Sequence, residues 1–156
     1  MRRWLPTKKK WISGVKPIVA YELAIFDLDG TILDTLQDLA DSVNHALISN
    51  SLKARSIDEI RSFVGNGIRK LIERSVPSDS STKVIDKVYK DFCSYYMKHC
   101  SDSTKPYDGI AELFASLKAK GIMVAIVSNK ADEAVQVLCN KFFSGLVSIA
   151  VGEHKG

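Results

Sequence analysis

Several residue types and patterns are scarce in this 156-residue chain. It has three cysteines, three histidines and two tryptophans. No apolar run approaches the ~20 residues that a membrane-spanning helix needs, and no apolar segment typical of a secretory signal follows the basic start. These absences argue against a membrane protein and against a disulfide-rich secreted domain. We expect a cytoplasmic protein with no transmembrane segment.

The cysteines are too few and too scattered to form a metal site or a disulfide framework. Cys93 and Cys100 lie seven residues apart, without the close spacing of zinc ligands, and Cys139 is distant from both. We therefore expect reduced, buried thiols and assign no chemistry to the cysteines or to the isolated histidines.

The charge is divided unevenly along the chain. Of 22 basic residues, six lie in residues 1–20, which contain no acidic residue. Residues 21–156 then hold 16 basic against 18 acidic residues, a net charge of −2, and so no nucleic-acid surface is indicated there. A basic segment of this kind is compatible with a transit peptide or with contact to an anionic surface. We expect residues 1–20 to be a disordered extension.

The most informative stretch is residues 24–31, in which an apolar run ends in Asp27-Leu28-Asp29-Gly30-Thr31. Residues i and i+2 of a strand point to the same side, so Asp27 and Asp29 begin on one side where the strand opens into a loop. A cation relieves the repulsion between two adjacent carboxylates, and carboxylate oxygens suit Mg²⁺. Gly30 allows close approach of a ligand to the backbone, and Thr31 supplies a hydroxyl. The stretch predicts a phosphoryl-transfer site.

Continued by Ile32-Leu33-Asp34-Thr35, the stretch resembles the first motif of the haloacid dehalogenase superfamily of phosphatases. Within that superfamily the chain is most similar to the phosphoglycolate phosphatase-like branch. A strand ending in an acidic turn and a phospho-acceptor domain of the response-regulator kind are the alternatives, and the Gly-Thr pair after the two aspartates disfavours both. The resemblance implies an α/β fold, namely a Rossmann-like parallel sheet with an inserted helical cap domain.

Residues 36–102 carry a succession of helical patterns. Leu36, Leu39, Ala40, Val43 and Leu47 follow the spacing of an amphipathic helix. A capping box formed by Ser56 and Glu59 starts another helix. Such helices bury their apolar faces against one another, and by resemblance this segment is the cap. Gly65-Asn66-Gly67 lies where the family places a substrate-facing loop, although a plain interhelical turn would also need these residues.

An α/β pattern resumes near residue 103. Residues 122–127 form a continuous apolar run typical of a buried parallel strand, which ends in Ser128-Asn129-Lys130. A helix follows, and residues 147–151 predict a third strand. This order indicates a doubly wound parallel sheet of three strands, with ligands at the carboxyl ends of the strands. The predicted core therefore comprises residues 21–35 and 103–156.

Ser128 ends the second strand as Asp27 ends the first. A strand-terminal serine before a helix is by itself most often an N-cap, but paired with the aspartate motif it matches the family's second motif, which binds phosphate. Asn129 and Lys130 would orient or neutralise the phosphate, or Lys130 would be an exposed loop lysine.

The resemblance also implies a mechanism. Asp27 attacks phosphorus to form an aspartyl-phosphate, and Asp29 acts as general acid and then as general base. Mg²⁺ is held by Asp27 and by the backbone carbonyl of Asp29, while Thr31 and Ser128 donate to the phosphate oxygens. The expected substrate is a small phosphorylated metabolite.

The family's later motifs, a lysine and further metal-binding acids, are not found before residue 156. Lys155 follows the third strand too closely to be that lysine. We therefore expect an incomplete core in which the first strand is an exposed edge, with self-association through that edge as a consequence. Three alternatives stay open: a truncated inactive domain, a phosphomutase like beta-phosphoglucomutase, and a pyrophosphatase of the same superfamily.

Overall fold

The computed structural model of the chain describes residues 21–154. The expectations for residues 1–20 and for Lys155 lie outside the described residues. In chain order the elements are β1 (Leu23–Phe26), β2 (Leu33–Asp34), α1 (Leu36–Ser49), α2 (Ile57–Phe63), α3 (Gly67–Ser75), α4 (Thr82–His99), β3 (Lys105–Pro106), α5 (Ile110–Ala119), β4 (Met123–Ala131), α6 (Asp132–Phe143) and β5 (Ile149–Glu153).

The main sheet has three parallel strands in the order β1-β4-β5. Ala125 in the central strand pairs with Ile25 of β1 and with Ile149 of β5. The expected parallel α/β fold is thus present. Within the described residues β1 has a neighbour on one side only, so the prediction that it is an edge strand is confirmed.

Two strand boundaries differ from the sequence expectation. β4 continues through Ser128 to Ala131, because Ala131 pairs with Glu153 after a shift of register that begins at Val127. β5 begins at Ile149, two residues later than expected. Residues 128–130 therefore form the irregular part of a strand near its carboxyl end, a place where a bulge can redirect side chains.

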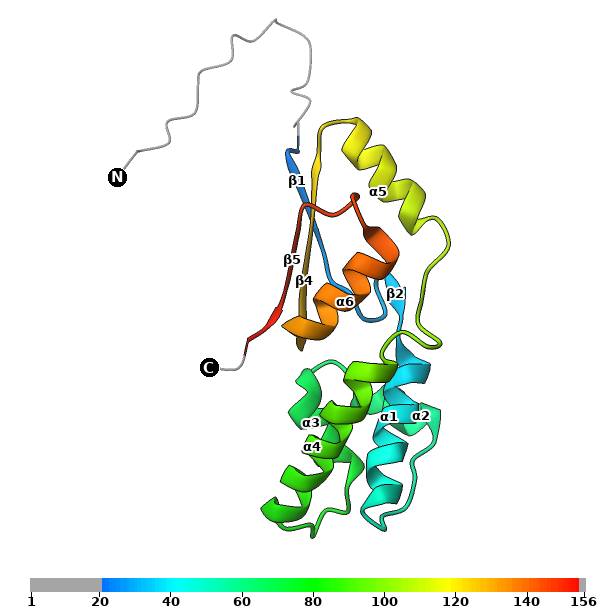
Figure 1. Ribbon diagram of the computed structural model, residues 1–156, viewed down its shortest axis with the longest axis vertical. Helices are drawn as coiled ribbons and strands as arrows, with labels where there is room; N and C mark the ends of the chain where they lie inside the picture. The colour runs from blue at the N-terminus through cyan, green and yellow to red at the C-terminus, as the bar shows by residue number, and fades with distance from the viewer. Residues whose placement is uncertain (1–20, 155–156) are drawn as a thin grey trace, which may run out of the picture.

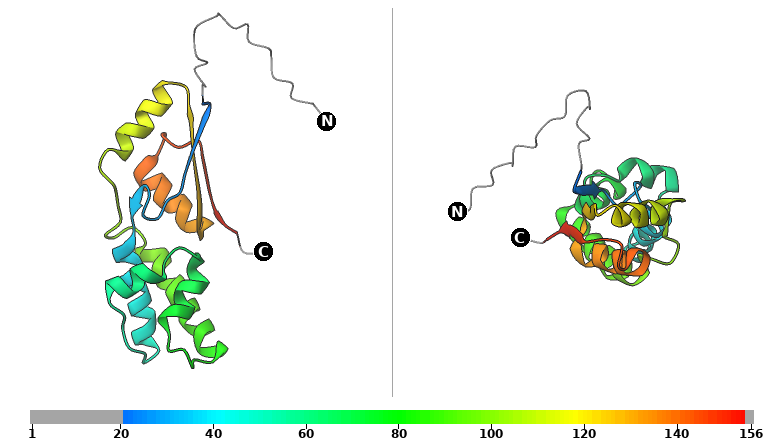
Figure 2. Two further views of the ribbon diagram at one scale, coloured as in Figure 1. Left: turned by 180° about the vertical axis from the view of Figure 1, so that it is seen from behind. Right: turned by 90° about the horizontal axis from the view of Figure 1, so that it is seen from above.

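The expectation of a doubly wound sheet is wrong for the described residues, because α5 and α6 cover the same face (Figure 2). Right-handed crossovers explain this arrangement. The chain steps from β1 to β4 and from β4 to β5 in one direction across the sheet, and two right-handed connections made in the same direction place their helices on the same side.

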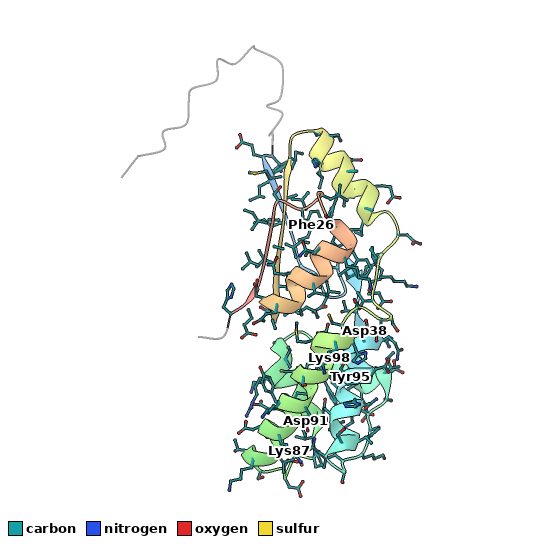
Figure 3. All side chains as sticks on the ribbon, in the orientation of Figure 1. Phe26, Asp38, Lys87, Asp91, Tyr95 and Lys98 are labelled. Carbon is teal, nitrogen blue, oxygen red and sulfur yellow. The ribbon has the colours of Figure 1, made fainter. Side chains whose placement is uncertain are left out.

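Apolar side chains fill the space between this covered face and the two helices. The ring of Phe26 lies 5.1 Å from that of Phe114 on α5, which lies 5.0 Å from that of Phe143 on α6. Phe114 and Phe143 are buried, and Phe26 lies between sheet and helices (Figure 3). These tilted ring pairs hold β1 and both helices in one core.

Helices α1–α4 form a bundle at one end of the molecule, beyond the carboxyl ends of the main strands (Figure 1). Val43 and Leu47 on α1 and Val88 and Phe92 on α4 are fully buried in it. The capping box predicted for α2 is confirmed, because Ser56 and Glu59 bond reciprocally to each other's backbone amides.

Two segments connect the bundle with the sheet, and they pair with each other. They meet as the antiparallel strands β2 and β3, in which Leu33 is opposite Pro106 and Asp34 is opposite Lys105. The sequence analysis did not predict these two-residue strands, which are too short to show any periodicity.

The expectation of buried thiols is confirmed for Cys100 and Cys139 but is wrong for Cys93, which is half-buried. Cys100 and Cys139 are buried, and burial raises the pKa of both thiols, that of Cys139 to about 11. None of the helices in residues 21–154 is long and apolar enough to cross a membrane.

Candidate active site

Asp27 and Asp29 line one cavity, which opens between the carboxyl end of the main sheet and the helical bundle. From the sheet side the lining includes Ser128, Asn129 and Lys130. From the bundle side it consists of Leu39, Val64, Gly65, Gly67, Ile68 and Leu71. The fold therefore brings most of the sequence-predicted site residues to one place, although they lie up to 103 positions apart in the chain.

Asp29 is held by two side chains. The Lys130 ammonium donates to both carboxylate oxygens, at 2.9 Å to Oδ1 and 3.0 Å to Oδ2. The Thr35 hydroxyl donates to Oδ1 at 2.7 Å. A carboxylate that accepts three hydrogen bonds, two of them charge-assisted, has little freedom to rotate.

Lys130 is buried, with 2% of its side chain exposed, so the alternative of an exposed loop lysine is wrong. Besides Asp29, its ammonium contacts the ring of Tyr96 on α4, at 4.9 Å from the ring centre. Burial opposes the positive charge, but Tyr96 and Asp29 outweigh this effect and raise the pKa of Lys130 above its ordinary value. Lys130 is therefore a buried cation in an ion pair with Asp29.

Tyr96 reaches this ion pair from the helical bundle. Its side chain is almost fully buried, and its hydroxyl has no hydrogen-bond partner among the described residues. Burial raises the pKa of Tyr96 to about 12, against the opposing effect of Lys130. Near neutral pH Tyr96 is a neutral phenol that presents its ring to the ammonium.

Asp27, by contrast, is exposed. Among residues 21–154 its one side-chain hydrogen-bond partner is the Thr31 hydroxyl, which is 3.5 Å from Oδ2, at the limit of a hydrogen bond. Thr31 is exposed and lines no described cavity, whereas Gly30 lines an adjoining hollow on the other side of Asp29. Gly30 has a φ of +73°, so its turn favours glycine.

The β4 segment supplies polar atoms opposite Asp27. The Ser128 side chain is half-buried at the cavity, and its oxygen accepts a long hydrogen bond, 3.3 Å, from the backbone amide of Lys130. The Ser128 hydroxyl hydrogen is therefore available to an anion. Asn129 is exposed on the same lining.

Two of the three residues of the Gly65-Asn66-Gly67 loop line the cavity. Gly65 and Gly67 line the cavity and both have positive φ, +114° and +80°. Asn66 does not line it, because its side-chain oxygen accepts a hydrogen bond from Arg74 within the bundle. The loop precedes α3, whose first backbone amides receive no side-chain cap and can therefore face an anionic ligand.

Sequence reasoning missed Thr35 and Tyr96 as parts of the site. Thr35 stands in the motif by which the family was recognised, six residues after Asp29, so its position was a usable signal. Tyr96 had no such signal, because its spacing on α4 is that of a buried helix face. Only the packing of α4 against the sheet shows its contact with Lys130.

The donor groups at the cavity suit a hard divalent cation. Both oxygens of Asp29 are engaged by Lys130, but Asp27 offers an exposed carboxylate. No backbone hydrogen bond to the Asp29 carbonyl is found in residues 21–154, so that oxygen is also available. In the same range no group of three or more His, Cys, Asp or Glu side chains gathers. These two oxygens fit Mg²⁺, which usually binds one or two carboxylates and keeps several waters.

Comparisons with known proteins agree with this geometry. Residues 24–146 match the family model described as haloacid dehalogenase-like hydrolase. A phosphoglycolate phosphatase from Agrobacterium fabrum is 35% identical over 113 residues, which cover 70% of this chain and 48% of that protein. One from Colwellia psychrerythraea is 34% identical over 142 residues, covering 84% of this chain and 61% of the relative. The chain spans about half the length of the curated relatives that it matches.

The fold is also similar to that of solved structures. The crystal structure of a protein described as a predicted phosphoglycolate phosphatase from Haemophilus somnus has a TM-score of 0.80 and 30% identity with this chain. The match covers 85% of this chain and 62% of that structure.

Proposed function

The chain belongs to the haloacid dehalogenase-like hydrolase family, and we propose that the protein is a phosphatase of small phosphomonoesters, with phosphoglycolate as its substrate. The observation that carries the proposal is the common cavity of Asp27, Asp29 and Ser128, in which an exposed carboxylate stands beside a second carboxylate and a hydroxyl. The names of the relatives in the previous subsection support phosphoglycolate.

In the first chemical step Asp27 is the nucleophile. One of its carboxylate oxygens bonds to phosphorus while the bond from phosphorus to the leaving oxygen breaks. Asp29 gives its proton to that oxygen, which leaves as an alcohol. Ser128 donates to a non-bridging phosphate oxygen, with Thr31, Gly30 and Asn129 as the neighbouring phosphate-binding groups.

In the second step water attacks phosphorus and the bond to Asp27 breaks. Asp29, now a carboxylate, takes the proton of the water, so both the nucleophile and the acid are regenerated. The ion pair with Lys130 and the hydrogen bond from Thr35 suit both roles, because they hold the Asp29 carboxyl in one orientation.

Mg²⁺ is the cofactor that fits the proposal, held by the Asp27 carboxylate and the Asp29 backbone carbonyl. When bound, it offsets the repulsion between an anionic nucleophile and a phosphate dianion. All other contributions come from the side chains named above.

We assign the helical bundle, residues 36–102, as the cap, and residues 21–35 and 103–156 as the catalytic core. The contribution of Gly65 and Gly67 to the cavity supports this division. The amides at the start of α3 would receive the carboxylate of phosphoglycolate, whose two anionic ends then meet opposite walls of the cavity. Asn66 would act only by holding this loop.

Self-association through the sheet is part of the proposal. The uncovered face of the sheet carries exposed apolar side chains, among them Ile25, Met123, Val127 and Ile149, and β1 offers an unpaired edge. A contiguous apolar patch of this kind marks an interaction surface, and we propose a second copy of the chain as its occupant. The cytoplasmic location stays a prediction.

The test is release of phosphate from phosphoglycolate with and without Mg²⁺, in the unaltered protein and in Asp27→Asn. We expect activity that EDTA removes, that Mg²⁺ restores, and that the variant lacks. Asp79→Asn, in an exposed loop of the bundle, is the matched control and should keep full activity. Activity that survives in Asp27→Asn would refute the nucleophile, and phosphate binding without turnover in the unaltered protein would favour the inactive alternative.

A further inference from the structure

We propose that Lys130 and Tyr96 are positioning residues for Asp29, and that they make its placement depend on docking of the helical bundle against the sheet. This inference rests on the proposed function and adds to it. Lys130 belongs to β4 in the sheet and Tyr96 to α4 in the bundle. The contact between Lys130 and Tyr96 therefore connects the sheet with the bundle. Lys130 in turn binds Asp29, the residue assigned as general acid and base.

The first argument is the burial of the ammonium. A charged lysine with 2% of its side chain exposed is costly unless it is paired. Within residues 21–154 the ammonium forms an ion pair with both oxygens of Asp29 and with no other charged side chain. Lys130 and Asp29 therefore fix each other, since movement of either would leave a buried charge without its partner.

The second argument is the position of Tyr96. The centre of its ring lies 4.9 Å from the ammonium, and both side chains are almost fully buried. Its buried hydroxyl makes no hydrogen bond in the described part of the chain. The Tyr96 side chain that contacts the ammonium therefore comes from α4, the element that separates from the sheet if the bundle swings away.

The third argument concerns what Lys130 does not do. Atoms of Lys130 line the cavity, but its ammonium is already engaged by a bidentate carboxylate and an aromatic ring. A lysine in this position acts on the phosphate through Asp29. Its loss should thus impair proton transfer to the leaving group more than binding of the phosphate.

Leaving groups distinguish these two roles. An alkyl phosphate such as phosphoglycolate needs a proton on its leaving oxygen, whereas 4-nitrophenyl phosphate releases a stable phenolate and needs little help. kcat/KM reports the step that phosphorylates Asp27. In Lys130→Met we expect kcat/KM to fall by about 10²-fold for phosphoglycolate, the size of a general-acid contribution, and by less than about 10-fold for 4-nitrophenyl phosphate.

The matched controls come from the same chain. Lys118→Met removes an exposed lysine that donates to a backbone carbonyl and should change neither value. Lys130→Arg keeps the charge and should recover part of the loss for phosphoglycolate. Tyr96→Phe keeps the ring and should lose less than Tyr96→Leu, which should reproduce part of the selective loss. If Lys130→Met fails to fold, the two Tyr96 variants decide the question.

Equal losses of kcat/KM for both substrates would overturn the proposal in favour of direct phosphate binding. Values of kcat/KM that stay as in the unaltered protein for both substrates, in Lys130→Met and in Tyr96→Leu, would overturn it altogether. A measurement without turnover separates it from the proposed function. The unfolding constants of Lys130→Met, Tyr96→Leu and the double variant should depart from additivity by about threefold or more. Additive effects would refute the contact between the two residues. Non-additivity in a protein without phosphatase activity would refute the function and leave the contact standing.

Discussion

Asp38, in the first turn of α1, accepts hydrogen bonds from the backbone amides of Ser103 and Thr104, both at 2.8 Å. Asp38 is 3% exposed, and it lies where the bundle meets the sheet (Figure 3). The two segments that join these parts are thus fastened together beside the β2–β3 pair. The position of the bundle over the cavity depends on this connection.

Replacing Asp38 by alanine should destabilise the protein. The change leaves two backbone amides without a partner, at least one of them buried, and we expect a loss of about 2–4 kcal/mol in the free energy of unfolding. Chemical denaturation at neutral pH measures it. Asp41→Ala, on the same helix but exposed, is the control and should cost less than about 0.5 kcal/mol. Equal losses in the two variants would contradict the role of Asp38.

The charge of Asp132 should stabilise the protein only above acidic pH. A hydrogen bond from the backbone amide of Gly152 lowers the pKa of Asp132, and Gln136 adds to the effect. A carboxyl whose folded-state pKa is depressed contributes stability above its unfolded pKa, ~3.9, and loses it as the pH falls through the folded value. Asp132→Asn keeps an acceptor for Gly152 but removes the charge.

We therefore expect Asp132→Asn to be less stable than the unaltered protein at pH 7, with the difference shrinking as the pH falls below the unfolded pKa of ~3.9. Denaturant titrations across this range measure it. Asp79→Asn, in an exposed loop, should show no such change with pH. A difference that stays constant as the pH falls below ~3.9 would show that the charge of Asp132 is not the cause.

Gly152 should not tolerate a side chain. A Cβ atom at this position would lie 2.5 Å from the backbone oxygen of Lys130 and 2.6 Å from the Cα atom of Asp132, so backbone would have to move. We expect Gly152→Ala to lose about 1–3 kcal/mol of stability. Ser148→Ala, exposed just before the same strand, is the control. Unchanged stability in Gly152→Ala would mean that β5 and the start of α6 do not approach this closely.

Self-association should depend on the uncovered face of the sheet. Ile25 is 62% exposed there, and Ile25→Glu places a charge in the proposed contact. We expect the unaltered protein to dimerise with increasing concentration and the variant to stay monomeric in analytical ultracentrifugation. Ile48→Glu removes an equally exposed isoleucine, 63%, from α1 and should leave the dimer intact. A monomer at every concentration of the unaltered protein would refute the second copy as occupant.

The sequence was sufficient for most of the elements and for the main residues of the candidate site. The apolar run before Ser128 predicted a parallel strand, and Ser56 with Glu59 predicted a helix start, because both depend on neighbouring residues. The strands β2 and β3 and the extension of β4 to Ala131 depend on partners 22 to 73 positions away. Local patterns carry no information about such partners.

The sequence by itself predicted the chemistry of the candidate site, since Asp27, Asp29, Gly30 and Thr31 lie within five consecutive positions that directly follow β1. Tertiary structure alone decided how Asp29 is held. Lys130 could have been exposed or buried, and Tyr96 could have served only the bundle. Lys130 is buried where β4 meets the bundle, in contact with Tyr96 of α4, and a buried ammonium is costly unless it is paired with a carboxylate. The ion pair with Asp29 follows from this burial, which no local pattern specifies.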